Sequence, residues 1–178
     1  MSETIERAET AADVAAVKTL FRAYAESLDF SLCFQDFEAE MADFPGRYGG
    51  PGGCLLLARS GDRPVGAVGL WSLGGGVCEM KRMYVLPEAR GAGLGRRLAV
   101  AIIAEGRRLG YRAMRLDTVP RLMAPAVALY RELGFREIPA YTHNPIEGAI
   151  YMELDLGTGR DAAAGDRGGR EWRPIASR

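Results

Sequence analysis

A run of closely spaced glycines lies where a predicted strand changes into a predicted helix. The segment reads VLPEARGAGLGRRLAV from Val85 to Val100, with Gly91, Gly93 and Gly95 at every second position. Glycine inside regular structure costs conformational entropy, so three together indicate a backbone that bends sharply or that another group approaches closely. A helix that begins at such a turn exposes backbone N–H groups at the positive end of its dipole, which suits a phosphate.

Two familiar nucleotide-binding loops do not fit this segment. The Walker loop requires a lysine followed by serine or threonine after its last glycine, and Gly95 is followed by two arginines. The dinucleotide fingerprint requires Gly-x-Gly-x-x-Gly, whereas the spacing here is Gly-x-Gly-x-Gly. The glycines therefore indicate a phosphate loop of another kind.

The rest of the chain alternates between helical and extended patterns. Apolar residues at helical spacing predict helices over residues 11–28, 34–44, 93–109 and 124–133. Three strand-like runs separated by SGDR and LGGG predict an antiparallel meander that ends at Val85. A strand through Asp117 and two closing strands over 135–141 and 148–156 complete a single α/β (α+β) domain.

Composition excludes several classes of partner. The chain has 23 basic and 23 acidic side chains, so no electrostatic footprint for nucleic acid is expected. No apolar run is long enough to span a membrane and no signal peptide is evident, so we expect a cytoplasmic location. Three cysteines and one histidine argue against a disulfide framework and against a metal site. Residues 1–156 form the expected domain, and 157–178, rich in Gly, Arg and Asp, are expected to be a mobile tail.

Two motifs resemble those of one acetyltransferase superfamily. Arg90-x-x-Gly93-x-Gly95, placed directly after a strand, resembles the acyl-CoA pyrophosphate loop of the GNAT N-acetyltransferases. The run ALYRELGF from Ala128 to Phe135 resembles the Leu-Tyr-x-x-x-Gly-Phe signature of the same superfamily. The resemblance covers roughly residues 4–156 and implies a mixed, mostly antiparallel sheet, flanked by helices and splayed between its fourth and fifth strands. Some segments are similar to a narrower branch of bacterial and fungal members with unassigned substrates.

The resemblance also implies a co-substrate, acetyl-CoA, with no metal. Its pantetheine arm would lie between the strand ending at Val85 and the strand through Asp117, where a backbone N–H would polarise the thioester carbonyl. The implied binding residues are Met83, Tyr84 and Val85 on the strand and Arg90, Gly91, Ala92, Gly93, Leu94, Gly95 and Arg96 on the loop. Met123 stands where many relatives carry an asparagine, so no polar contact is expected from that position.

Catalysis by such a protein needs two proton transfers. The resemblance makes Tyr130 the candidate acid that protonates the departing thiolate; the alternative is a core tyrosine. Asp117 and Glu79 are the candidate bases, although Glu79 could instead pair with a basic neighbour at the surface. Strict strand alternation places Glu79, Lys81, Met83 and Val85 on one face, and Met80, Arg82 and Tyr84 on the other.

The acceptor is expected over the second helix and the last loop. Phe30, Phe34 and His143 are the candidate substrate-binding residues, although a lone histidine beside a proline is often a turn or core residue. Asp29, Asp36, Glu38, Glu40 and Asp43 make the second-helix region acidic, which suits a cationic amine but also fits a solvated helix face.

The predicted activity is transfer of an acetyl group from acetyl-CoA to a primary amine, directly within a ternary complex. The amine could belong to a small molecule, an amino acid or a peptide N-terminus. The alternatives are a non-catalytic acyl-CoA sensor and an acetyltransferase that acts on a protein side chain. Homodimers are frequent in the superfamily, so a homodimer stays open.

Overall fold

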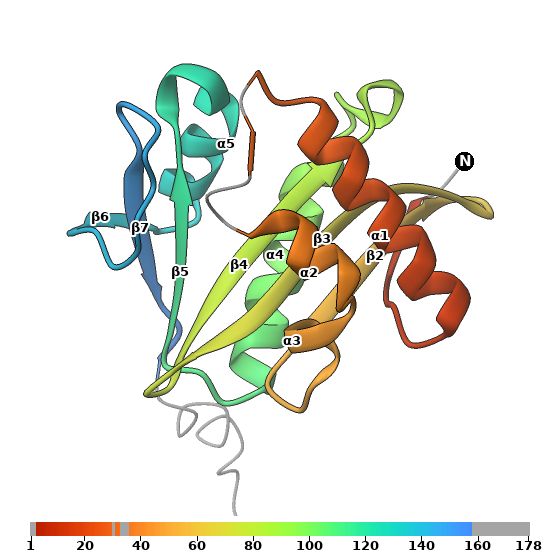
Figure 1. Ribbon diagram of the computed structural model, residues 1–178, viewed down its shortest axis with the longest axis horizontal. Helices are drawn as coiled ribbons and strands as arrows, with labels where there is room; N and C mark the ends of the chain where they lie inside the picture. The colour runs from red at the N-terminus through yellow and green to blue at the C-terminus, as the bar shows by residue number, and fades with distance from the viewer. Residues whose placement is uncertain (1–2, 30, 33–35, 158–178) are drawn as a thin grey trace, which may run out of the picture.

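A seven-stranded sheet covered by helices on both faces forms the body of the protein (Figure 1). The computed structural model describes residues 3–29, 31–32 and 36–157. The strands are β1 Glu3–Arg7, β2 Cys54–Ser60, β3 Arg63–Gly74, β4 Val77–Val85, β5 Ala113–Thr118, β6 Arg136–Ile138 and β7 Ile150–Asp155. The helices are α1 Ala11–Glu26, α2 Phe37–Ala42, α3 Gly46–Gly49, α4 Leu94–Arg108 and α5 Pro120–Glu132, with a short 3₁₀ turn η2 over Pro87–Ala89. Phe30, Phe34 and most of the predicted tail lie outside the described residues.

The sheet divides into two parts that touch at one corner. Its strand order is β1-β2-β3-β4-β5-β7-β6, and every neighbouring pair is antiparallel except β4 and β5. The parallel β4–β5 contact consists of three residue pairs, Val77 with Ala113, Cys78 with Met114 and Glu79 with Arg115. Beyond them the two strands diverge, as Figure 1 shows. The expected mixed sheet, splayed between its fourth and fifth strands, is confirmed.

Two apolar layers hold the helices against the sheet. On one face, Leu98 and Ile102 of α4 are fully buried against Met114 of β5 and Met152 of β7. The other face carries α1, α2 and α3, where Phe21 packs edge-on against the ring of Tyr48 with centroids 5.7 Å apart. The helical spacing of these apolar residues explains why each helix turns a single stripe toward the sheet.

The first turn of α1 is closed by a capping box. The Thr10 hydroxyl accepts a hydrogen bond from the Asp13 backbone N–H at 3.1 Å, and the Asp13 carboxylate accepts one from the Thr10 N–H at 3.2 Å. Arg59 of β2 also donates to Asp13, at 2.6 Å. The bonds from Thr10 and then from Arg59 lower the pKa of Asp13 below its usual 3.8.

Several predicted elements have different bounds in the structure. The strand β1 was not expected, the helix expected over 34–44 is described as α2 over Phe37–Ala42, and α3 lies in a segment for which no helix was predicted. Helix α5 begins at Pro120, but Met123 has non-helical angles (φ −131°, ψ 36°) that interrupt it. Pro125 therefore follows a break, where its missing N–H and fixed φ are tolerated.

Candidate active site

Strand β4 contains a bulge at Arg82 that changes which side chains share a face. The β3–β4 register jumps from Gly69 opposite Lys81 to Ala67 opposite Tyr84, and Arg82 has a left-handed φ of 57°. The extra residue reverses the alternation beyond this point.

The predicted faces of β4 are therefore wrong beyond Lys81. Met83 and Val85 pack on the α4 side together with Met80, and not with Glu79 and Lys81 as strict alternation required. Tyr84 joins the core on the α1–α3 side, which is also the side to which the Arg82 side chain turns, toward α2.

A cleft of about 590 Å³ opens where β4 and β5 diverge. It is bordered by α1, the end of β4, the glycine loop and α5. Eight of the ten residues expected to bind the co-substrate line this cleft: Met83, Tyr84, Val85, Arg90, Gly91, Gly93, Leu94 and Gly95. Ala92 and Arg96 do not line it, and the Arg96 guanidinium instead pairs with Glu132 at 2.6 Å. Met123 and Leu129 of α5 form part of the opposite wall.

The glycines of the loop serve two different geometrical needs. Gly91 and Gly93 have φ of 91° and 75°, which other residues rarely adopt. Gly95 has no such angle, but a Cβ there would meet nothing within 4 Å and the residue lines the cleft. Arg90 donates from Nε to the Val85 carbonyl at 3.0 Å and so ties the loop to the end of β4.

The start of α4 fits an anionic ligand. Gly93 is its N-cap, and no side chain in the described part of the chain caps this end. The N–H groups of the first turn are therefore open toward the cleft, at the positive end of a helix of 15 residues. This cradle of backbone donors matches the size and charge of a phosphate group.

A second cavity of about 580 Å³ lies on the other side of the divergence. Its walls come from α2, α3, β3, β4 and the segment between β6 and β7. Its polar and aromatic lining includes Asp36, Glu40, Asp43, Arg47, Tyr48, Trp71, Glu79, Lys81 and His143. Three of the five acidic residues singled out in the α2 region thus border this cavity. Glu38 does not; it pairs with Arg22 on the outside of α2, at 3.4 Å.

A small space of about 50 Å³ lies between the two cavities. Tyr24 and Met123 line both this small space and the 590 Å³ cleft. Lys81 lines both the small space and the 580 Å³ cavity. Asp117 also borders it. The three spaces therefore adjoin one another at Tyr24, Met123 and Lys81, close to the candidate base Asp117, whereas Tyr130 lines none of them.

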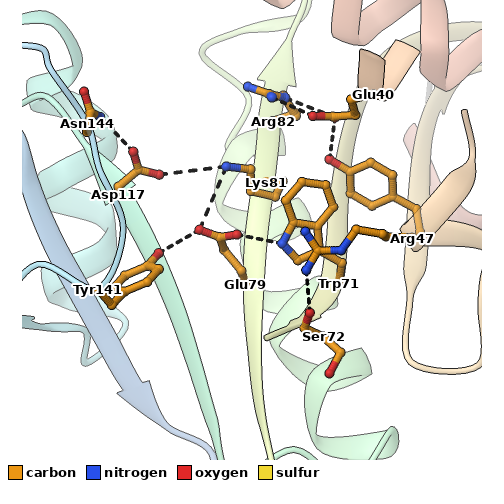
Figure 2. Close-up of polar contacts among 11 residues, drawn as sticks. Glu40, Arg47, Trp71, Ser72, Glu79, Lys81, Arg82, Asp117, Tyr141 and Asn144 are labelled. Atoms are coloured by element: carbon orange, nitrogen blue, oxygen red, sulfur yellow. Dashed lines mark hydrogen bonds and ion pairs between the residues drawn. The ribbon is translucent and has the colours of Figure 1, made fainter. Parts of the chain in front are cut away.

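Glu79 is held in a buried network, which excludes the surface pairing considered for it. Glu79 is 4% exposed. Trp71 donates from its indole nitrogen to Oε2 at 2.6 Å, and Tyr141 donates from its hydroxyl to Oε1 at 2.8 Å (Figure 2). Burial, followed by the nearby charge of Glu79, raises the pKa of Tyr141 above its ordinary value, so this phenol stays a donor.

Lys81 joins the two candidate bases into one cluster. Its Nζ lies 3.9 Å from Glu79 Oε1 and 4.0 Å from Asp117 Oδ1 (Figure 2). Asn144, from the segment that precedes β7, donates to Asp117 Oδ2 at 2.7 Å. No pattern in the sequence singles out Trp71, Tyr141 or Asn144, because their contacts join segments that are far apart along the chain.

Tyr130 lies in the core between α5 and the sheet. It is 7% exposed, and its ring centroid is 5.7 Å from that of Phe135. Burial raises its pKa above the ordinary value, and the charges of Tyr24 and Asp117 raise it further. The hydroxyl thus stays protonated over the physiological range, within electrostatic reach of Asp117.

The two described cysteines, Cys54 and Cys78, are buried and form no disulfide. Burial raises the pKa of the Cys54 thiol and raises that of Cys78 to about 12, so neither is a ready nucleophile. Within the described ranges, no group of three or more His, Cys, Asp or Glu side chains is placed to hold a metal ion. None of the described helices is long and apolar enough to span a membrane.

Comparison with known proteins identifies the class to which this fold and site belong. Residues 15–135 match the family described as the acetyltransferase (GNAT) family. An uncharacterized N-acetyltransferase of Schizosaccharomyces pombe is 42% identical over 141 residues, which cover 78% of this chain and 86% of that protein. The chain belongs to the GNAT family of acetyltransferases.

Solved structures show the same fold. An acetyltransferase of the GNAT family from Staphylococcus aureus has a TM-score of 0.70 and 18% identity, over 87% of this chain and 99% of its own. A phosphinothricin acetyltransferase of Sinorhizobium meliloti, solved in complex with acetyl-CoA, has a TM-score of 0.69 and 23% identity, over 90% and 92%.

Proposed function

We propose that the protein transfers an acetyl group from acetyl-CoA to a primary amine, directly within a ternary complex of enzyme, acetyl-CoA and acceptor. The observation that carries this proposal is a series of three adjoining spaces. The 590 Å³ cleft shares Tyr24 and Met123 with the small space of about 50 Å³, and that space shares Lys81 with the 580 Å³ cavity. One cavity ends at a phosphate cradle and the other at carboxylates. A donor and an acceptor bound in them would bring their reacting ends together at the small space between the cavities, which Asp117 borders.

The 590 Å³ cleft is the proposed site for acetyl-CoA. The open N–H groups at the start of α4 would receive the pyrophosphate, and Arg90 would add positive charge at the mouth of the cleft. Met83, Tyr84 and Val85 would bind the pantetheine arm through backbone groups. The acetyl-CoA bound to the Sinorhizobium meliloti relative supports this choice of co-substrate.

The proposed reaction balances as a simple acyl transfer. The acceptor nitrogen forms a bond to the thioester carbonyl carbon, the carbon–sulfur bond breaks, and CoA leaves as a thiolate. Asp117 or Glu79 takes a proton from the amine, directly or through water, and Tyr130 gives one to the thiolate. A backbone N–H near Met83 would stabilise the charge on the carbonyl oxygen, an effect typically worth about 3 to 4 kcal/mol.

The 580 Å³ cavity is the proposed acceptor site. Its carboxylates, which include Asp36, Asp43 and Glu79, outnumber the basic groups of Arg47 and Lys81 on the same walls, and this excess favours a cationic amine. His143 lies on its rim and is the proposed contact from the last loop.

The first test is thermal unfolding with and without acetyl-CoA. At a ligand concentration of about 100 times the dissociation constant, binding adds about 2.7 kcal/mol, which corresponds to roughly 5 to 10 °C for a chain of this size. Gly95→Trp, which places a bulky side chain on the cleft, should abolish the rise while the ligand-free midpoint stays close to that of the wild type. A panel of primary amines scored by CoA release then tests transfer.

The outcomes separate the alternatives. No rise at millimolar acetyl-CoA or other acyl-CoAs would overturn the proposal. A rise that Gly95→Trp abolishes, without CoA release on any amine or protein acceptor, would favour the sensor.

A further inference from the structure

The bulge in β4 has a backbone geometry that requires support from elsewhere. Arg82 adopts a φ of 57°, and left-handed backbone at a residue other than glycine costs about 1 to 3 kcal/mol. Arg82 and Met83 together face the single residue Val68 in the register with β3. The direction of the Met83 N–H follows from the backbone angles of Arg82, so whatever holds Arg82 also aims this amide.

A buried ion pair holds the Arg82 side chain. Its Nη2 lies 2.7 Å from Glu40 Oε2 and its Nε lies 3.3 Å from Glu40 Oε1, which makes a two-pronged contact (Figure 2). The side chains are 2% and 10% exposed. The Phe37 ring lies against the guanidinium at 5.0 Å. Removal of one charge from such a pair leaves the other buried without compensation, which is strongly unfavourable.

The carboxylate of Glu40 is already engaged in hydrogen bonds within the protein, although Glu40 borders the 580 Å³ cavity that is proposed for the acceptor. Besides two contacts from Arg82, its carboxylate accepts a 2.7 Å hydrogen bond from the Tyr48 hydroxyl. Burial, then the charge of Glu40, raises the pKa of Tyr48 well above its ordinary value, so this phenol remains a donor. Three contacts use most of the lone pairs of the carboxylate, which leaves it poorly suited to act as a base.

We infer that Glu40 is a positioning residue: through Arg82 it holds the β4 bulge in the shape that aims the Met83–Val85 backbone at the thioester. Glu40 thereby links α2, a wall of the acceptor cavity, to the backbone that would bind the acetyl group. This inference rests on the proposed function for its catalytic consequence, but the holding of the bulge is a property of the protein alone.

The test compares Glu40→Gln with Glu38→Gln, a matched change on the same helix at an exposed residue. Amide hydrogen exchange should become faster at Met83 to Val85 in Glu40→Gln and stay unchanged in Glu38→Gln. Since a misplacement of about 1 Å can cost 100-fold in rate, kcat should fall about 10- to 100-fold in Glu40→Gln. The KM of the acceptor and the Kd of acetyl-CoA should change little.

A double variant controls for loss of stability. Glu40→Gln with Arg82→Gln removes both buried charges and should recover most of the stability lost in the single variant. Its kcat should stay low because the bulge is still not held. Recovery of kcat together with stability would overturn the inference.

Two further results would overturn it, and a third concerns the function. Unchanged exchange at Met83–Val85 in Glu40→Gln would show that the pair does not hold the bulge. A raised acceptor KM at unchanged kcat would show that Glu40 contacts the acceptor instead. If wild-type protein fails to bind acetyl-CoA, the proposed function and the catalytic consequence both fail, while the exchange data still decide whether Glu40 holds the bulge.

Discussion

The indole nitrogen of Trp71 donates a 2.6 Å hydrogen bond to Glu79 Oε2, and the two residues are direct partners in the register of β3 and β4. The bond therefore lies across neighbouring strands, on the face that borders the 580 Å³ cavity. With the hydroxyl of Tyr141 on the other oxygen, it fixes the orientation of a carboxylate that is almost completely buried. Such a fixed carboxylate is well placed to attract a cation.

Replacement of this indole should therefore destabilise the protein. Trp71→Phe keeps an aromatic ring but removes the N–H, so Glu79 loses one of its donors in a buried position. We expect the free energy of unfolding to fall by about 1 to 3 kcal/mol, measured by urea denaturation. Tyr141→Phe removes the donor from the other oxygen and should have an effect of the same sign. Full stability in both variants would show that water replaces these donors.

Loss of the Tyr130 hydroxyl should slow catalysis without loss of acetyl-CoA binding. In Tyr130→Phe, we expect kcat to fall by about 100- to 10,000-fold, measured by CoA release. Because the pKa of Tyr130 is raised, the phenol is protonated at all pH values up to and beyond its ordinary pKa of 10. The wild-type rate should therefore show no loss through ionisation of this group between pH 7 and 9. A kcat equal to that of the wild type would assign Tyr130 to the core alone.

Two glycine-to-alanine changes should have opposite effects on stability. At Gly69 an added Cβ would lie 2.5 Å from Cε1 of the Tyr48 ring, so Gly69→Ala should destabilise the protein by about 1 to 3 kcal/mol. At Gly95 a Cβ meets nothing and the residue is helical, so Gly95→Ala should leave stability unchanged or raise it by up to about 1 kcal/mol. Denaturation of both variants side by side tests this; equal effects would contradict it.

The capping box of α1 should make part of the stability depend on pH. The pKa of Asp13 is lowered in the folded protein, first by the hydrogen bond from Thr10 and then by that from Arg59. A carboxylate of this kind stabilises the fold above its usual pKa of 3.8 and loses that contribution as pH falls through its lowered value. Asp13→Asn should therefore unfold at lower temperature than the wild type at pH 7, and the difference should shrink below pH 3.8. Exposed Asp62→Asn is the control; a difference independent of pH would contradict the prediction.

The sequence was sufficient for features that depend on local chemistry. The glycine loop, the helix that follows it and the signature through Tyr130 are each set by residues within a short window. Through their resemblance to motifs of the GNAT family, they implied the fold and the position of the cleft. The charged strand β1 was missed because ETIER, from Glu3 to Arg7, has a single apolar residue and gains its strand form from pairing with β2.

The buried polar cluster could not be predicted, because burial of charge depends on distant partners. Charged residues are almost never buried unless they are paired, so Glu79 and Lys81 were reasonably considered for surface pairing. The partners that permit their burial come from β3, β5 and the segment before β7. The bulge at Arg82 has no signal in the sequence either, because left-handed backbone angles are usually found at glycine or asparagine and seldom at arginine.

The narrow contact between β4 and β5 makes the protein a pair of half-sheets joined near one corner. The half that carries β1 to β4 includes the glycine loop and most walls of the 580 Å³ cavity. The half that carries β5 to β7 includes Asp117, Tyr130, Tyr141 and Asn144. Both cavities are bounded by both halves, because the second half supplies Leu122 and Met123 of α5 to the 590 Å³ cleft and His143 to the 580 Å³ cavity. The angle between the halves therefore shapes both cavities at once, although the pairs Val77–Ala113 and Cys78–Met114 that join the halves line neither cavity.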